Sequence, residues 1–331
     1  MTELLKVEDL VVRFRIKTAL RALIERADTA FIEAVAGVSL TLGEGEAMGI
    51  VGESGSGKTT LARAIIGLVP PAEGSIHFNG ENITHRSQSD MKPFRRQISM
   101  MFQDPAGSLS PRLTVGSLIT EPYRIHGMKG RDLAAEGRRL LELVGLPAHF
   151  GDRFPHQLSG GQARRVGVAR ALALDPKLIL ADEPTAGLDV SVQGEILNLL
   201  ARLQDQIGLS ILMITHNLNV VRHFSDRIAI MYLGRFVETG PTDDIFRAPH
   251  HPYTAALLSA NPQPDPDARL TRIELSGDLP SLLNRPSGCE FHPRCFRARP
   301  LCKTVVPEVS RRNSCSFTCH FPLSEGDAVT S

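Results

Sequence analysis

Apolar residues recur along the chain with two different periods, and these periods divide the first 240 residues into short elements. Apolar and polar residues alternate over residues 4–14 and again over 35–42, which predicts two strands. Short apolar runs typical of buried strands lie at residues 48–51, 98–102, 177–181 and 210–214. Apolar residues at helical spacing predict helices at residues 59–68, 115–145, 163–174 and 192–206. Strands that alternate with helices favour an α/β fold with a mainly parallel sheet.

Residues 15–33 separate the first two predicted strands with a different pattern. Their apolar residues fall on one helical face, and the basic residues off that face are Arg15, Lys17, Arg21 and Arg26. This pattern predicts a helix that packs on the surface of the sheet. A second interpretation stays open, because a basic amphipathic helix also suits a membrane surface or a partner subunit.

Shorter signals complete the pattern. Residues 74–80 predict a strand that ends in an Asn-Gly turn, and residues 228–238 predict a hairpin around Gly234. The composition changes after Gly240. The elements expected there are helices at 243–246 and 251–258, a Pro- and Asp-rich linker at 261–288, and a Cys-containing segment at 289–320.

The Gly-rich residues 52–60 carry the clearest chemistry. They fit the P-loop pattern G-x-x-x-x-G-K-[ST], between a predicted strand and a predicted helix. Glycines let backbone N–H groups approach a phosphate chain, Lys58 adds a positive charge, and Thr59 offers a hydroxyl to Mg²⁺. The residues expected to bind the nucleotide here are Gly52, Ser54, Gly55, Gly57, Lys58, Thr59 and Thr60.

Two adjacent carboxylates follow the apolar run 178–181. Asp182 fits an acid that holds Mg²⁺ directly or through water, and Glu183 fits a base that polarises the attacking water. An apolar strand that ends in acids is common by itself. Its position 124 residues after Lys58 favours nucleotide chemistry.

A second Gly-rich stretch, Leu158-Ser-Gly-Gly-Gln162, opens the helix predicted at 163–174. Its residues Ser159, Gly160, Gly161 and Gln162 would form another phosphate cradle at a helix N-terminus. One ATP does not need two cradles from one subunit. We therefore expect this cradle to close on the nucleotide held by another subunit.

Together with Gln103, Asp189 and His216, these motifs resemble the ATP-binding-cassette (ABC) ATPases, in the family's order along the chain. The resemblance covers about residues 4–240. It implies ATP hydrolysis between two subunits arranged head to tail, with Asp189 near the nucleotide. It also implies that Gln103 and His216 sense the γ-phosphate, that Gln103 reaches Mg²⁺, and that His216 helps to position water for Glu183.

The pattern of elements, the change of composition after Gly240 and this resemblance together give the expected fold class and domain plan. We expect a P-loop α/β core with an antiparallel β part, a helical subdomain at about residues 104–172, and a small Cys-rich C-terminal module. The expected domains are 1–240 for ATP binding, 241–288 for C-terminal helices and linker, and 289–322 for the Cys-rich module. An aromatic residue that stacks on adenine is expected at Phe14, with Phe31 as the alternative.

Three further stretches resemble the ATPase subunits of bacterial oligopeptide, dipeptide and nickel importers: residues 103–112, 251–254 and 288–295. The resemblance implies ATP-driven import, with peptide as the leading cargo. The implied partners are a second ATPase subunit, the same or paralogous, two membrane permeases, and an extracellular binding protein that acts indirectly. The implied location is peripheral, on the cytoplasmic face of the inner membrane.

The composition agrees with a role at a membrane through partners. The 331 residues carry 37 basic and 36 acidic side chains, a net charge of +1, which gives no global attraction to nucleic acid. No apolar run reaches the ~20 residues of a membrane span, and the first residues do not resemble a signal peptide. We expect a soluble, cytosolic chain with no nucleic-acid partner.

A soluble ABC ATPase that acts on nucleic acid or ribosomes is the alternative. DNA-repair and chromosome-structure ATPases carry a long coiled coil between P-loop and signature, whereas only about 100 residues separate Lys58 from Ser159, without sustained heptads. Ribosome-binding members usually carry two cassettes in one chain, and this chain has one.

All five cysteines lie after residue 288, with five, six, twelve and three residues between them. No C-x₂-C pair indicates zinc, and four thiolates suit a [4Fe–4S] cluster. The resemblance to importer ATPases implies that the ligands are Cys289, Cys295, Cys302 and Cys319, which leaves Cys315 as the spare. Reduced thiols in a small packed segment are the alternative.

Overall fold

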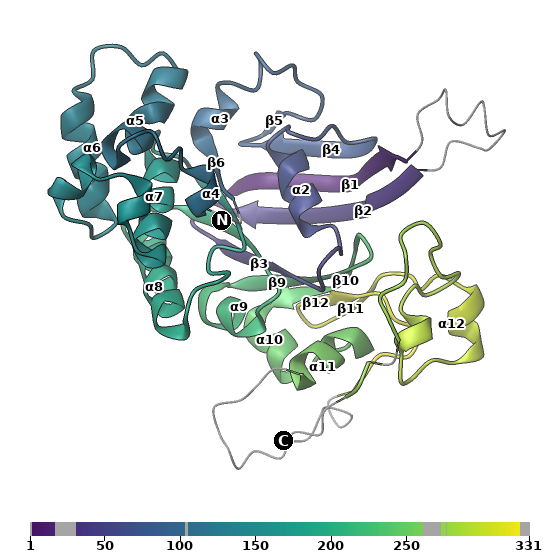
Figure 1. Cartoon of the computed structure of the whole chain (residues 1–331). Coiled ribbons are helices and arrows are strands. Elements are labelled where there is room, and N and C mark those ends of the chain that lie inside the picture. The colour runs from purple at the N-terminus through teal and green to yellow at the C-terminus, as the bar shows by residue number, and fades with distance from the viewer. Residues whose placement is uncertain (1, 17–30, 103–104, 261–272, 276, 325–331) are drawn as a thin grey trace.

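The protein is described by a computed structural model that covers residues 2–16, 31–102, 105–260, 273–275 and 277–324 (Figure 1). Two sheets organise it. The smaller sheet has the order β2-β1-β4-β5, and the larger has the order β11-β12-β10-β9-β3-β8-β7-β6.

The smaller sheet is antiparallel. Its strands are β1 (Glu3–Arg15), β2 (Phe31–Gly43), β4 (Glu73–Phe78) and β5 (Glu81–Asn82). Leu5, Val7 and Val12 of β1 are buried, and the last of these pairs with Val35 of β2. The predicted antiparallel part is therefore present, and its apolar face packs against helix α2 (Lys58–Ile65).

The helix predicted over residues 15–33 is wrong at both of its ends. Arg15 ends β1 and Phe31 begins β2, and these two residues face each other in the antiparallel register. Hydrogen bonding between residues far apart in the chain overrode the local helical pattern there. Lys17, Arg21 and Arg26 lie outside the described residues.

The larger sheet contains the predicted parallel core. Strands β3 (Ala47–Val51), β6 (Ile98–Met101), β7 (Leu178–Asp182), β8 (Ser210–Thr215) and β9 (Arg227–Tyr232) run parallel to their neighbours within this group. Leu178 and Leu180 face the cluster around α2, whereas Ile179 and Ala181 face the opposite helices. A sheet covered on both faces explains why these strands are continuous apolar runs.

Three antiparallel strands extend this sheet beyond β9: β10 (Arg235–Pro241), β11 (Ser310–Arg312) and β12 (Cys315–Phe317). The pairing of β9 with β10 is the predicted hairpin. Phe317 of β12 lies opposite Glu238 of β10. Strands β11 and β12 thus continue the main sheet, and a separate Cys-rich module at 289–322 stays a prediction.

The helix predicted over 115–145 is two helices, α5 (Val115–Ile125) and α6 (Leu133–Leu143). Gly127 and Gly130 adopt positive φ between them, and the side chain of Asp132 caps α6. Helix α7 (Gly160–Leu172) starts three residues before the expected start because Ser159 is its N-cap. Figure 1 shows α5, α6 and α7 gathered at one end of the molecule.

The other helices of six or more residues are α8 (Val190–Ile207), α9 (Leu218–Phe224), α10 (Thr242–Arg247) and α11 (Pro252–Ser259). The shorter elements are α3 (Phe94–Gln97), α4 (Pro105–Ser108), α12 (Pro300–Thr304), η1 (Ala148–Asp152), η2 (Pro155–Gln157) and η3 (His292–Arg294). Within the described ranges, no helix is both long enough and apolar enough to cross a membrane.

Candidate nucleotide site

The P-loop joins the end of β3 to the start of α2, as the sequence predicts. Two of its glycines are required by close packing. A Cβ atom on Gly52 would lie 2.1 Å from the carbonyl oxygen of Met231, and one on Gly57 would lie 2.1 Å from that of Ala34. Gly57 also adopts a φ of 103°, which side chains disfavour. The loop is thus pressed against strands β2 and β9.

Lys58 is buried at the start of α2. Its ammonium donates to the carbonyl oxygens of Gly52 and Glu53, both at 2.8 Å, and to Ser56 Oγ at 3.1 Å. Burial lowers the pKa of Lys58, and the nearby carboxylates, led by Glu183, oppose that shift. The ammonium is therefore hydrogen-bonded to its own loop, and bound phosphates would replace some of these acceptors.

Thr59 and Asp182 meet although 123 positions separate them. Thr59 Oγ1 donates to Asp182 Oδ1 at 3.1 Å. Burial raises the pKa of Asp182, and the hydrogen bond from Thr59 lowers it. A hydroxyl and a carboxylate are the hard oxygen donors that Mg²⁺ prefers, and Mg²⁺ in nucleotide sites needs only one or two protein ligands besides phosphate. The third expected magnesium contact, Gln103, lies outside the described residues.

Glu183 and His216 form a tight pair at the ends of β7 and β8. Glu183 Oε1 lies 2.8 Å from His216 Nδ1 and accepts the His216 backbone N–H at 3.1 Å, while Glu183 Oε2 accepts Thr215 Oγ1 at 3.2 Å. The Glu183 side chain is 12% exposed and the His216 side chain 67%. Glu183 has a φ of 50°, a strained backbone for a residue with a side chain. The carboxylate is thus held in one place beside an exposed imidazole.

The second Gly-rich stretch lies at an exposed helix start. Ser159 Oγ accepts the Gln162 N–H at 3.3 Å, and Gln162 Oε1 accepts the Ser159 N–H at 3.0 Å, a capping box. Gly161 packs against Val192 of α8. Where the structure describes both stretches, no hydrogen bond joins residues 158–162 to residues 52–60.

The remaining predicted residues have these positions. Asp189 caps α8 by accepting the Val192 N–H at 2.9 Å. Phe14 and Phe31 are 42% and 46% exposed, at adjoining ends of β1 and β2, and the Arg15 guanidinium lies 5.6 Å from the Phe31 ring centroid. Thr60 lies in the first turn of α2, with Ser54 and Gly55 exposed in the loop before it.

Comparisons with known proteins agree with this arrangement. The oligopeptide transport ATP-binding protein OppF of Escherichia coli (strain K12) is 46% identical over 326 residues, which cover 97% of each chain. A putative oligopeptide transport ATP-binding protein of Bacillus subtilis (strain 168) is 47% identical over 296 residues, 87% of this chain and 89% of that one. The chain belongs to the ABC transporter ATP-binding proteins.

Family profiles place this membership along the chain. The ABC transporter profile matches residues 35–186, and the profile of the oligopeptide/dipeptide transporter C-terminal region matches residues 237–302. A dimeric ATP-binding cassette in a post-hydrolysis state, bound to ADP and Pi, has a TM-score of 0.63 at 30% identity. The matched part covers 72% of this chain and 98% of that cassette. This chain is therefore an ABC-type ATPase with a P-loop NTPase fold.

The C-terminal part of this ABC protein gathers four of its five free cysteines around one small cavity: Cys289, Cys295, Cys302 and Cys319. Cys315 lies elsewhere, with its sulfur against Gly240 of β10. Burial raises the pKa of Cys295 to about 11 and that of Cys319 to about 12, and neighbouring thiols add to both shifts. No three His, Cys, Asp or Glu side chains of the described ranges form a ready-made metal site.

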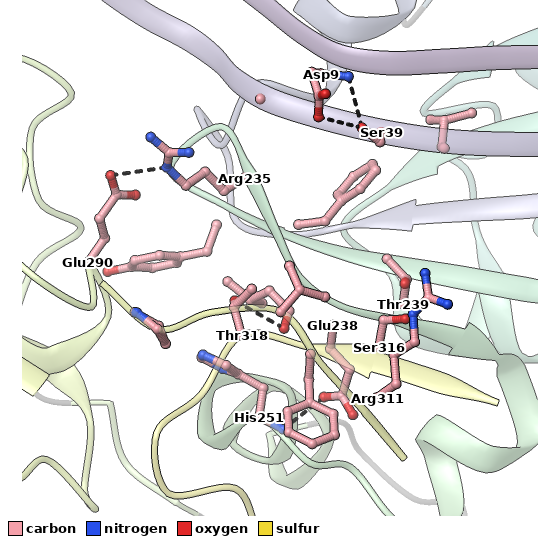
Figure 2. A pocket seen from close by; sticks show the side chains of 18 of the residues that line it. Asp9, Ser39, Arg235, Glu238, Thr239, His251, Glu290, Arg311, Ser316 and Thr318 are labelled. Carbon is pink, nitrogen blue, oxygen red and sulfur yellow. Dashed lines mark hydrogen bonds and ion pairs between the residues drawn. The ribbon is translucent and has the colours of Figure 1, made fainter. Parts of the chain in front are cut away.

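A larger cavity of about 700 Å³ lies between the smaller sheet and the C-terminal strands (Figure 2). Figure 2 shows Arg235 paired with Glu290, and Glu238 below them beside His251. The Glu238 carboxylate accepts the His250 and His251 backbone N–H groups at 2.7 and 3.0 Å, which ties β10 to the start of α11. None of the expected nucleotide-binding residues lines this cavity.

Sequence reasoning did not find several residues that support the nucleotide site. Thr215 holds Glu183, and Tyr253 and Arg294 contact Glu53 of the P-loop from the C-terminal part. Arg294 stands 241 positions from its partner, so no local pattern connects the two. Tyr253 lies in the stretch 251–254 that the sequence singled out only as a family resemblance.

Proposed function

We propose that the chain is the ATP-hydrolysing subunit of an ABC importer that takes up di- or oligopeptides or a related small solute. The observation that carries this proposal is the joint match of an ABC cassette and an oligopeptide/dipeptide transporter C-terminal region in one chain. Relatives that span nearly the whole chain are named for oligopeptide transport. They do not favour the alternative of an ATPase that acts on nucleic acid or ribosomes.

In this proposal the residues divide the work by their chemistry. The P-loop amides and Lys58 bind the phosphates, and Thr59 and Asp182 hold Mg²⁺, whose charge stabilises the phosphates when it is bound. Glu183 polarises the attacking water. His216, with Nδ1 2.8 Å from Glu183 Oε1, helps to position the water for Glu183, and its side chain is 67% exposed and thus accessible to the γ-phosphate it would sense. Gln103 is proposed as a further γ-phosphate and Mg²⁺ contact.

The second half of each site comes from another ATPase subunit. The exposed Ser159 and Gly160 stand free of this chain's own P-loop, which supports a cradle that serves a partner's ATP. One structural relative is a dimeric ATP-binding cassette in a post-hydrolysis state. Closing and opening of the pair would move two membrane permeases between access states. The subunit would then be peripheral, on the cytoplasmic face of the membrane, with an extracellular binding protein acting through the permeases.

The function is tested by reconstitution of the full chain with the permeases, the second ATPase and the binding protein in proteoliposomes. We expect ATP hydrolysis to rise several-fold when the binding protein carries peptide. Labelled peptide should move across the membrane, from the side of the binding protein to the side of the ATPase subunits, and accumulate there. A matched sample with ligand-free binding protein is the control. Stimulation by RNA or ribosomes, without any response to loaded binding protein, would support the alternative function instead.

We also propose that Cys289, Cys295, Cys302 and Cys319 hold a [4Fe–4S] cluster with a structural role. The support is their shared cavity and the exclusion of Cys315 from it. The backbone N–H of Cys289 donates to the carbonyl of Cys302 at 2.9 Å, which holds the segments of two of the four cysteines together. Since burial raises the pKa of Cys289, Cys295 and Cys319, cluster binding must displace protons from them. A short segment with few large apolar side chains gains most from such a staple.

A further inference from the structure

The loop between Cys289 and Cys295 reaches the P-loop. Arg294, the last residue of η3, donates from Nη1 to Glu53 Oε1 at 3.1 Å and to Glu53 Oε2 at 3.0 Å. The Arg294 side chain is 8% exposed and that of Glu53 is 26% exposed. A pair this shielded from water is weakened little by salt.

Glu53 is held at three points. Besides the contact with Arg294, its backbone N–H donates to the hydroxyl of Tyr253 at 3.2 Å, and its carbonyl accepts the Lys58 ammonium at 2.8 Å. Tyr253 is fully buried in α11 and packs on Tyr232 and Phe291. Glu53 is thus held by residues of the C-terminal part of the chain and also contacts Lys58, the lysine proposed to bind phosphate.

We propose that Arg294 is a positioning residue for ATP: it neutralises Glu53 and, with Tyr253, holds the P-loop in its binding conformation. A carboxylate in a phosphate-binding loop repels a polyanion, and the repulsion is strong where water is partly excluded. A guanidinium whose Nη1 contacts both carboxylate oxygens offsets that charge and fixes the side chain. Loop geometry set in advance lowers the cost of binding. This role goes beyond the proposed transport function and does not depend on a cluster at the cysteines.

The chain offers a matched control for this contact. Arg285 also ties the C-terminal part to the core, with Nη1 2.7 Å from Glu290 Oε1 and Nη2 2.6 Å from the Glu33 carbonyl oxygen. Its side chain is similarly shielded, at 18% exposed. Arg285 forms no hydrogen bond to residues 52–60 of the described structure. If Arg294 were only a tether, loss of either arginine would have the same effect on ATP.

The experiment measures Mg-ATP affinity of the full-length chain by displacement of a fluorescent ATP analogue. The variants are Arg294→Met, Arg294→Lys, Arg285→Met, Glu53→Gln and the double variant Arg294→Met/Glu53→Gln. We expect Arg294→Met to raise the Kd about tenfold, Arg294→Lys to raise it less because the charge remains, and Arg285→Met to change it less than about twofold. Melting temperatures report the loss of the tether in both Met variants.

The double variant separates charge from packing. We expect its Kd to lie closer to that of the original protein than the Kd of Arg294→Met does, because no unpaired carboxylate then remains in the loop. In the assembled ATPase, KM for ATP should rise in Arg294→Met while kcat at saturating ATP is kept, since the hydrolytic groups Glu183 and His216 directly follow β7 and β8 and do not contact Arg294.

Three results would overturn the proposal. The first is an unchanged Kd for Mg-ATP in Arg294→Met, and the second is a rise of this Kd in Arg285→Met equal to that in Arg294→Met. The third is a double variant whose fold-change in Kd equals the product of the fold-changes of Arg294→Met and Glu53→Gln. If Arg294→Met misfolds, the same comparison of Kd values is made between Arg294→Lys and the double variant Arg294→Lys/Glu53→Gln. Failure of peptide-stimulated transport would leave this result untouched, because ATP affinity is measured on the chain alone.

Discussion

Replacing Glu183 with glutamine is expected to lower ATP turnover by about two to four orders of magnitude while ATP binding is kept. The amide cannot take up a proton from water, so the polarising group is lost. The fold should remain, because the side-chain oxygen of glutamine can still accept from His216 N–H or Thr215 Oγ1, the present partners of the carboxylate. Trapped ATP should then hold the subunit in a closed pair, alone or with its paralogue.

The measurements are steady-state phosphate release, ATP affinity, and the size of the complex by light scattering with and without Mg-ATP. Glu195→Gln is the matched control, since that carboxylate is 57% exposed and pairs only with Arg165 in the described contacts. It should keep normal turnover. Near-normal turnover in Glu183→Gln would remove this residue from the role of base and leave His216 as the group to test next.

Substitution of Cys319 by serine is expected to abolish iron binding, whereas Cys315→Ser should leave it intact. Anaerobically purified protein should be brown, with about four irons per chain. Three thiolates and a serine hydroxyl give a poorer ligand set for the cluster. The two residues are close in sequence, Cys315 buried and Cys319 partly buried, but only Cys319 lines the shared cavity.

Iron and acid-labile sulfide contents, together with visible absorption, measure this outcome. Thermal unfolding should show a lower Tm for Cys319→Ser than for Cys315→Ser, because only the first variant loses a ligand of the cluster that cross-links these segments. Colourless, iron-free protein from an anaerobic, iron-replete preparation would exclude the cluster and favour reduced thiols. Iron loss in Cys315→Ser alone would show that the ligand set is wrong.

Several parts of the fold and site were predictable because they depend on neighbouring residues. The P-loop consists of a strand end, a turn and a helix start within a dozen residues. Its glycines mark the positions where the backbone conformation or close packing excludes a side chain. The same holds for the capping box at Ser159, which orders a helix end by bonds across three residues. Buried parallel strands such as β7 are predictable from continuous apolar runs, since both faces of the sheet are covered.

Other features depended on contacts between distant parts of the chain, where local patterns carry no information. The helical spacing over 15–33 did not reveal that Arg15 and Phe31 would pair in a sheet. Nothing in residues 289–322 indicated that β12 would extend the main sheet beside β10.

The sequence by itself determined the chemistry of the nucleotide site, because each motif is a short run whose residue types serve one function. The tertiary structure decided which groups meet: Thr59 with Asp182, Glu183 with His216, and Arg294 with Glu53. The first two meetings follow from motif order in a parallel sheet, whose strand ends share one edge. The third arises only because the segment around Arg294 packs against the P-loop, and a contact between residues 241 positions apart cannot be predicted from local sequence.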